Sequence, residues 1–269
     1  MSAEPSLEAW PDALERACSR TTLLGHVFVL RETDSTQDAA ERMGVPVGSV
    51  VVAGRQTRGR GRLGAAWQDT RTDGLAVTFV VPTMAPERLS MASALAAARS
   101  VREGLPQEAA GRVGVKWPND VVAIGPGPIV RKMAGVLVET RQERAVVGIG
   151  VNVGQSAFAG DLAGRAASMV MLGGAADRLR VLQDLIRNLD QALAMDHAEL
   201  VATWRDLDRT AGMDLGFLTP DGPVRGTVLD CDPLRGLRVR TASGEIFLAS
   251  ATTRVQVEPP EGRSTMVAP

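Results

Sequence analysis

The chain has 269 residues, a formal net charge of −1 and 45% hydrophobic residues. Its length exceeds the roughly 150 residues typical of one domain, so we expect one large and one small domain. The balanced charge excludes a general attraction to nucleic acid or anionic lipid, and any anion site must therefore be local. The sequence has no apolar run of roughly 18 residues and begins with acids and a proline, which predicts a cytoplasmic protein without a membrane partner.

Strand and helix patterns alternate in the first part of the chain. The segment "DSTQDAAERM" has Asp34 or Ser35 as its expected N-cap, so a helix should follow the first strand directly. Strands are predicted at 26–32, 49–56 and 74–82, and helices at 34–43 and 87–105.

Three short apolar segments come next, at 112–118, 119–125 and 131–153. The last reads as a hairpin that turns at "RQER", and strands so close in sequence favour antiparallel pairing. The segment 175–208 has apolar residues at helical spacing and is predicted to form two helices separated near residues 195–197. The fold class is therefore α+β, with a mixed, mostly antiparallel sheet and flanking helices.

The pattern changes near Gly212 to short strands separated by the turn signals "TPDG", "DPLRG" and "ASG". This spacing predicts a small C-terminal β-barrel or sandwich. We expect a large domain over 1–211, the barrel over 212–258 and a disordered tail over 259–269.

Three arginines and three glycines lie in the loop "QTRGRGRLG", residues 56–64. It matches the dinucleotide-binding pattern G-x-G-x-x-G, but a new strand follows in place of the required helix. Glycines allow close approach of backbone to a ligand, and guanidinium groups match carboxylate or phosphate oxygens. The loop is thus either an anion-binding element or a solvated hairpin tip that protects a sheet edge.

Lysine is rare in this chain, since 28 of its 30 basic residues are arginine and the other two are Lys116 and Lys132. A compact ammonium and a planar guanidinium suit different sites, so both lysines are candidate functional residues. Cys18 and Cys231, like His26 and His197, are isolated in sequence and are given no metal-binding or catalytic role.

Five segments, in this order, resemble motifs of the biotin protein ligases, also called biotin–acetyl-CoA-carboxylase ligases. They are "TDSTQ" (33–37), "QTRGRGRLGAAW" (56–67), "KWPND" (116–120), "KMAGVLVE" (132–139) and "GIGVNV" (148–153). Both lysines fall inside these motifs. Because the first motif begins so near the N-terminus, the resemblance implies the monofunctional type without an N-terminal DNA-binding domain.

The resemblance implies an ATP-dependent, AMP-forming ligase that works in two half-reactions. The biotin carboxylate attacks the α-phosphate of ATP to give biotinyl-5′-AMP, and a lysine of a biotin carboxyl carrier domain then attacks the acyl carbon. The expected partners are biotin, ATP with Mg²⁺ and the carrier domain of an acyl-CoA carboxylase, and neither nucleic acid nor membrane. Fixed cations and enforced proximity would supply most of the acceleration.

The same resemblance assigns the site residues, with Arg62 and Lys116 in catalytic roles. The biotin contacts it implies are Ser35, Thr36, Gln37, Gln56, Arg60, Gly61, Arg62 and Lys116. The implied ATP or adenylate contacts are Gly59, Gly64, Trp67, Asn119, Lys132, Gly135 and Asn152. Mg²⁺ is expected to arrive on ATP, and no protein ligand is assigned to it.

Three other functions stay open on the sequence. A lipoate ligase shares the adenylation chemistry and a related fold, although "GRGRLG" and "KWPND" favour biotin. A nucleic-acid-binding regulatory module could use the arginine loop on phosphates. A non-catalytic interaction protein would have no chemical need for either lysine.

Overall fold

The computed structural model describes residues 4–61, 66–68, 73–125, 130–141, 143–250 and 252–256. The chain divides into two compact units, Met1–Arg209 and Thr210–Pro269. The helices of the first unit are η1 (Leu7–Ala9), α1 (Trp10–Cys18), α2 (Thr36–Met43), α3 (Pro86–Glu103), α4 (Gln107–Gly111), η3 (Gly160–Leu162), η4 (Val170–Leu172), α5 (Arg178–Ala194) and α6 (His197–Leu207). Its strands are β1 (His26–Thr33), β2 (Ser49–Gln56), β3 (Gly59–Arg60), β4 (Ala66–Trp67), β5 (Gly74–Pro82), β6 (Val113–Lys116), β7 (Asp120–Ile124), β8 (Val130–Arg141) and β9 (Arg144–Asn152).

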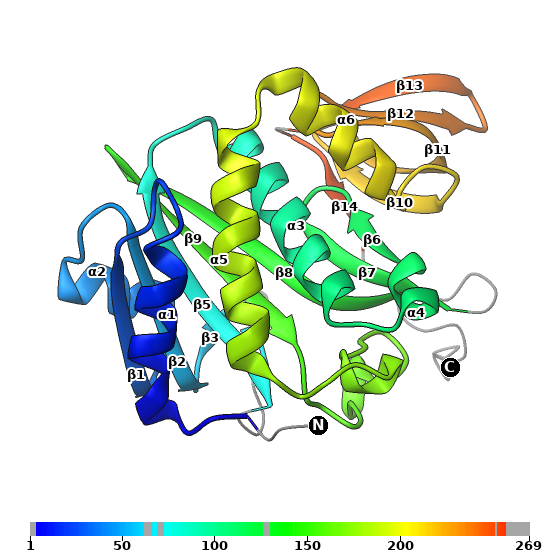
Figure 1. Ribbon diagram of the computed structural model, residues 1–269. Helices are drawn as coiled ribbons and strands as arrows, with labels where there is room; N and C mark the ends of the chain where they lie inside the picture. The colour runs from blue at the N-terminus through cyan, green and yellow to red at the C-terminus, as the bar shows by residue number, and fades with distance from the viewer. Residues whose placement is uncertain are drawn as a thin grey trace, which may run out of the picture. The chain divides into compact units, whose positions relative to one another are not determined.

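A seven-stranded sheet in the order β1-β2-β5-β9-β8-β7-β6 forms the centre of the first unit (Figure 1). Only β1 and β2 pair in parallel, because α2 returns the chain between them. The remaining neighbours pair antiparallel. The short connections at "WPN" and "RQER" favour this for β6 with β7 and for β8 with β9. The predicted α+β class with a mixed, mostly antiparallel sheet is confirmed.

The two faces of the sheet are covered differently. Helices α1, α3 and α5 cover one face (Figure 1). Helix α2 packs through Ala39 and Ala40 on Val51 and Val80, whose side chains point to the opposite face. Val51 and its strand neighbours in β2 are fully buried, so this strand contacts side chains on both faces, as its continuous apolar run predicts. Helix α2 covers only part of this second face.

Local sequence explains the helix ends. Ser35 is the N-cap of α2 and accepts a hydrogen bond from the Asp38 backbone N–H at 3.4 Å, so of the two predicted caps the structure selects Ser35. Gly44 ends this helix with φ 59°, a conformation that favours glycine. The two predicted C-terminal helices are confirmed, and Asp196 caps the second of them.

Helix α1 was not predicted from the sequence. It is amphipathic and buries Trp10, Leu14 and Cys18 at helical spacing, but it is only nine residues long and charged residues interrupt its apolar positions. Burial of the Cys18 thiol raises its pKa to about 11, so this cysteine is chemically inert at neutral pH.

The second unit is a five-stranded antiparallel sheet in the order β13-β12-β11-β10-β14. Its strands are β10 (Asp214–Thr219), β11 (Gly222–Asp232), β12 (Gly236–Thr241), β13 (Gly244–Ala249) and β14 (Arg254–Val255). Phe217, Leu237 and Val239 form its buried side. Closure into the predicted barrel would need a pairing between β13 and β14, which the described residues do not form. The predicted tail at 259–269 lies outside the described residues.

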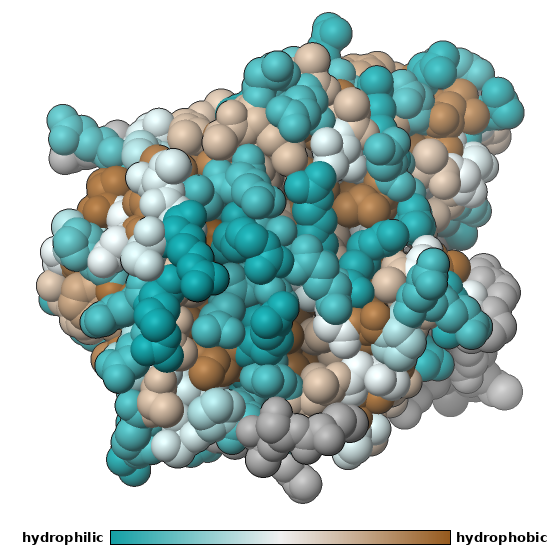
Figure 2. Space-filling model, viewed as in Figure 1, coloured by the Kyte–Doolittle hydropathy of each residue, from teal (hydrophilic) through white to brown (hydrophobic). Residues whose placement is uncertain are grey.

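Polar side chains dominate the molecular face over α1 and α5, with apolar residues scattered among them (Figure 2). No helix within the described ranges combines the length and the apolar content that crossing a bilayer demands.

The carboxylate of Asp190 connects the segment before β1 to helix α5. Asp190 on α5 is 9% exposed and accepts hydrogen bonds from the backbone N–H groups of Thr22 and Leu23, both at 2.9 Å. We expect Asp190→Ala to lower the free energy of unfolding by about 2–3 kcal/mol, because two part-buried donors lose their acceptor. Asp196→Ala removes an exposed cap instead and should cost about 1 kcal/mol. Chemical denaturation of both variants measures the difference, and equal losses would contradict this account.

Candidate active site

A row of paired residues crosses the sheet on the face that α1, α3 and α5 do not cover. Directly paired residues of neighbouring strands point to the same face, so their side chains line one path across the strands. From β2 to β6 the row consists of Ala53, Ala76, Gly150, Gly135, Asp120 and Lys116. Five strand spacings give it a length of about 24 Å. We call its first four members the small-residue floor.

The N-terminus of α2 lies beside one end of this floor. The Thr36 backbone N–H and hydroxyl both donate to Gln56 Oε1, at 2.9 and 3.2 Å. The Thr78 hydroxyl, from β5, donates to Thr36 Oγ1 at 2.8 Å. Ser35, Thr36 and Gln56 are all buried, so their polar atoms form a fixed, uncharged group of donors and acceptors.

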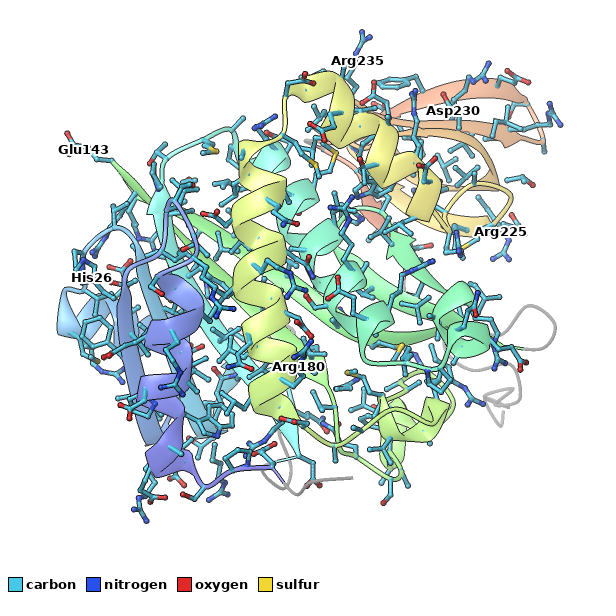
Figure 3. All side chains as sticks on the ribbon, viewed as in Figure 1. His26, Glu143, Arg180, Arg225, Asp230 and Arg235 are labelled. Atoms are coloured by element: carbon cyan, nitrogen blue, oxygen red, sulfur yellow. The ribbon has the colours of Figure 1, made fainter. Side chains whose placement is uncertain are left out.

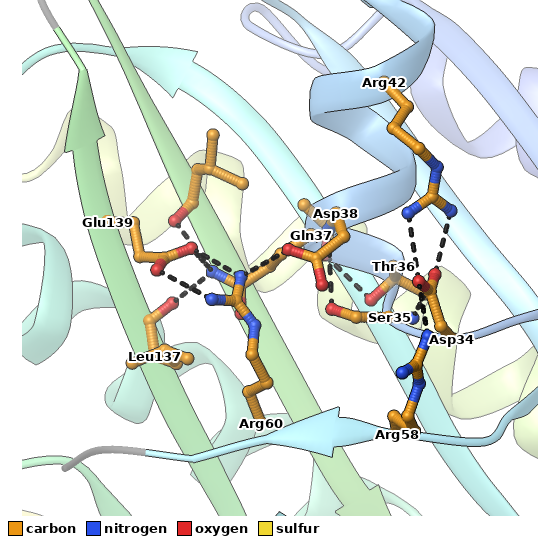
Figure 4. A network of polar contacts seen from close by, with 12 residues as sticks. Asp34, Ser35, Thr36, Gln37, Asp38, Arg42, Arg58, Arg60, Leu137 and Glu139 are labelled. Atoms are coloured by element: carbon orange, nitrogen blue, oxygen red, sulfur yellow. Dashed lines mark hydrogen bonds and ion pairs between the residues drawn. The ribbon is translucent and has the colours of Figure 1, made fainter. Parts of the chain in front are cut away.

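The Gln37 side chain crosses from α2 to the middle strands. Its Nε2 donates to Glu139 Oε2 at 3.1 Å (Figure 4). Its Oε1 lies only 2.5 Å from where a Cβ at position 148 would be. Gly148 is therefore required for Gln37 to lie flat on β9. Glu139 in turn binds the Arg60 guanidinium at 3.0 Å, and Arg60 also contacts Asp38 at 2.8 Å. Arg60 thus joins the loop at 56–64 to both α2 and β8.

Asp34 fixes the turn from β1 into α2. Hydrogen bonds from Arg42, and then from the Ser35 backbone N–H, lower the pKa of the Asp34 carboxyl far below its ordinary value. Arg58 approaches the same carboxylate at 3.6 Å (Figure 4). The carboxylate therefore stays ionised at any physiological pH and holds the helix N-terminus in place.

The Trp67 indole lies on the small-residue floor. A Cβ at Gly150 would lie under 3.0 Å from indole carbons of Trp67, and one at Gly135 would lie 3.4 Å from its Cζ3. Strand β4, which carries Trp67, pairs with β3 in a separate two-stranded hairpin, with Gly59 opposite Trp67. The absence of side chains at Gly150 and Gly135 is what lets the ring lie against the sheet.

Cations gather at the other end of the row. Lys132 Nζ lies 2.5 Å from Asp120 Oδ1. Lys116, half-buried at the end of β6, has no ion pair within 4.0 Å among the described residues. Burial lowers the pKa of Lys116, the nearby charges of Lys132 and Arg165 lower it further, and Asp120 opposes them. The cations Lys116, Lys132 and Arg165 outnumber the nearby carboxylate of Asp120, so this end has an excess of positive charge that attracts anions.

Two predicted asparagines have backbone partners. Asn152 is buried and its Nδ2 donates to the carbonyls of Lys132 and Ala167, both at 3.2 Å. Asn119 Nδ2 donates to the Val136 carbonyl, and the Val136 N–H donates to the Asn119 carbonyl at 3.1 Å. These contacts hold the strands that carry the lysines in register.

The structure therefore gathers the predicted residues into two groups, one polar and uncharged around Gln56 and one cationic around Lys116. Arg62 and Gly64 lie outside the described residues, while Gly61 ends the described part of the loop. His26 lies at the start of the edge strand β1 (Figure 3).

Several residues of the site were not singled out from the sequence. They are Asp38, Thr78, Asp120, Glu139, Gly148, Gly150 and Arg165. Asp120 and Glu139 stand inside the quoted motifs, which was an available signal, whereas nothing near Arg165 in sequence marks it. The described residues contain no group of three or more His, Cys, Asp or Glu side chains that could hold a metal ion.

Comparison with known proteins agrees with this geometry. Residues 29–156 match the model of the biotin/lipoate A/B protein ligase family. The chain is 35% identical over 195 residues to the biotin--[acetyl-CoA-carboxylase] ligase of Mycobacterium tuberculosis, covering 69% of this chain and 70% of that protein. It is 27% identical over 241 residues to the bifunctional ligase/repressor BirA of Bacillus spizizenii, covering 84% and 73% of the two chains.

A solved structure extends the similarity to the whole fold. Biotin protein ligase from Aquifex aeolicus, in complex with biotin and ATP, has a TM-score of 0.70 and 27% identity, covering 87% of this chain and 99% of that one. Sheet order, site and similarity together define a ligase of the biotin/lipoate class. The chain belongs to the biotin/lipoate A/B protein ligase family and, within it, to the biotin protein ligases. The resemblance seen in the five motifs is thus confirmed.

Trp67 offers a direct test of the floor. Trp10, Trp117 and Trp204 are at most 1% exposed, so collisional quenching of tryptophan fluorescence reports mainly on Trp67. We expect Gly150→Ala to displace the indole and to increase its quenching by acrylamide, because the new methyl group takes its place. Gly111→Ala is the control, since a Cβ there meets nothing within 4 Å. Unchanged quenching in Gly150→Ala would show that the ring does not rest on the floor.

Proposed function

We propose that this enzyme activates biotin with ATP to form biotinyl-5′-AMP and then transfers the biotinyl group to a lysine of a biotin carboxyl carrier domain. The observation that carries the proposal is the row across the sheet, with an uncharged polar group at one end and a cationic group at the other. Biotin has the same distribution, because its ureido ring is polar and neutral and its valeryl chain ends in a carboxylate. The names of the relatives and the biotin and ATP bound to the similar ligase support it.

The ureido ring is proposed to bind beside α2. Its N–H groups and carbonyl need acceptors and donors that are already fixed and dehydrated, which Ser35, Thr36 and Gln56 offer. Gln37 would contact the ring from the β8 side, where Glu139 orients its amide. Trp67, which occupies the space above Gly150 and Gly135, would form one wall of the biotin site.

The cationic end is proposed to hold the reacting groups. A carboxylate oxygen of biotin must approach the α-phosphorus of ATP, although both groups are anionic. Lys116 would lie between them and offset this repulsion, and Lys132 would contact the phosphates while Asp120 restrains it. The new O–P bond forms as pyrophosphate leaves with its bonding electrons. Mg²⁺ would arrive bound to the phosphates of ATP.

The loop and its hairpin are proposed to cover the adenylate. Trp67 would pack against the nucleotide, Gly59 and Gly61 would bring backbone close to it, and Arg62 would add a guanidinium. In the second half-reaction the carrier lysine attacks the acyl carbon and AMP leaves, so excluding water until the carrier binds preserves the mixed anhydride. Asn119 and Asn152 would act by holding the lysine-bearing strands.

Three sequence predictions stand beside this function as proposals. They are the cytoplasmic location, the domain division at 211 and 212, and closure of the second sheet into a barrel. Biotin is favoured over lipoate because the relative from Mycobacterium tuberculosis and the similar structure from Aquifex aeolicus are both named as biotin ligases. Incubating the purified protein with ATP, Mg²⁺, a carrier domain and either acid, followed by intact-mass measurement, tests the choice. A mass increase with lipoate alone would reverse it.

Lys116 should be essential for the first half-reaction. We expect Lys116→Ala to lower adenylate formation at least about 100-fold, since the charge that offsets carboxylate–phosphate repulsion is lost. Lys116→Arg should also be impaired, because a planar fork does not reproduce a point charge. Biotin-dependent exchange between pyrophosphate and ATP measures the rate, and unchanged thermal melting shows an intact fold. Wild-type exchange in both variants would remove Lys116 from the mechanism.

The affinity for ATP should depend on pH through Lys116. Because burial lowers its pKa below the ordinary 10.5, its ammonium is lost at a lower pH than that of an exposed lysine. Binding of the anion should be at full strength below this lowered pKa and should weaken as the pH rises through it. Calorimetric titration with ATP in alkaline buffers measures the decrease. The decrease should disappear in Lys116→Arg, whose side chain keeps its proton, and its persistence there would assign it to another group.

A further inference from the structure

We propose that Asp38 and Glu139 are positioning residues, which act through Arg60 to hold the β3–β4 hairpin over the small-residue floor. The inference rests on the proposed function, because it concerns the element that would cover the ligand. It separates Arg60 from the cations that meet the substrate. It also gives a role to Asp38, which the mechanism does not otherwise use, and a second role to Glu139, which orients Gln37.

The hairpin needs such support because it is too small to be stable alone. It has two residues in each strand and forms a sheet of its own, separate from the seven-stranded sheet. Isolated two-stranded hairpins are marginal in water even when longer. Just before β3, the backbone N–H groups of Thr57 and Arg58 donate to the carbonyls of Thr33 and Asp34. Within the described part of the hairpin, the contacts that hold it against the rest of the unit are therefore made by side chains.

Within the described part of the hairpin, two side chains reach the rest of the first unit. Trp67, on β4, rests on the glycines of β8 and β9. Arg60, on β3, contacts Asp38 of α2 at 2.8 Å and Glu139 of β8 through two hydrogen bonds, at 3.0 and 3.3 Å (Figure 4). A guanidinium can bind two carboxylates at once because its donors point in fixed, divergent directions. The contacts come from two different elements and therefore restrain Arg60 in two directions.

The charges around Arg60 argue against a direct role on a phosphate. One guanidinium faces two carboxylates, which leaves this cluster with a net charge of −1. Lys116 and Lys132, in contrast, face a single carboxylate at the other end of the row. A polyanion is repelled by the first cluster and attracted by the second. The Arg60 side chain therefore positions backbone and leaves the phosphates to the lysines.

These ion pairs are also suited to positioning more than to stability. The side chains of Arg60, Asp38 and Glu139 are 41%, 40% and 22% exposed, and exposed pairs of this kind contribute little to the free energy of folding. A change in ligand binding without a change in melting temperature is therefore the signature of the proposed role.

The test compares Asp38→Asn and the double variant Asp38→Asn/Glu139→Gln with Glu41→Gln. The control removes the 3.0 Å ion pair from Glu41 to Arg144, which joins the same helix to the same sheet without touching the hairpin. Asp38→Asn is informative by itself because Glu139 also orients Gln37. The readouts are acrylamide quenching of Trp67 without ligand, and kcat and KM of adenylate formation.

The double variant should show increased quenching of Trp67 and a KM for biotin raised about tenfold, with kcat changed less, since preorganisation of the cover is lost. Asp38→Asn should show part of both effects, and Glu41→Gln neither. Wild-type quenching and KM in the double variant, or equal losses in the control, would overturn the proposal. Because quenching is measured without substrate, it tests the positioning role even if the protein fails to activate biotin.

Discussion

The site depends on a steric constraint at the centre of the sheet. Gly135 and Gly150 pair directly on neighbouring strands, and their missing Cβ atoms leave bare backbone where an ordinary sheet would present side chains. Trp67 lies on this bare surface, and Lys132 crosses the edge of it toward Asp120. Any side chain at the two glycines would lift the hairpin and displace the lysine. The flat region is therefore the condition for the observed positions of Trp67 and Lys132.

The uncharged and the cationic groups lie at opposite ends of the row because different strands and helices contribute them. The uncharged hydrogen-bonding group comes from α2, β2 and β5, and the cations come from the β6–β7 turn and β8. Placing them at opposite ends lets one elongated ligand satisfy both, with its neutral ring away from the phosphates. The buried polar atoms near α2 are already paired with one another, so binding there exchanges hydrogen bonds between preformed partners.

The arginines near the site differ in what they contact. Arg42 and Arg58 converge on Asp34 and fix the turn before α2, while Arg60 bridges Asp38 and Glu139. Each of these guanidinium groups is paired with carboxylates, so the described loop arginines, Arg58 and Arg60, contribute little free positive charge. The net positive region is formed by the two lysines, together with Arg165. This distribution gives a physical reason for retaining lysine at only two positions of an arginine-rich chain.

The sequence by itself determined most elements and the chemistry of the ligand. Strands such as 49–56 and 74–82 were predicted with the bounds that they have, because periodicity and turn residues act locally. Five ordered motifs and the two lysines identified the family. Only the tertiary structure decided which residues share the row, which carboxylates bind Arg60 and that Asn152 bonds to backbone carbonyls. Those facts depend on register between strands far apart in sequence, and register is fixed by packing of the whole sheet on its helices.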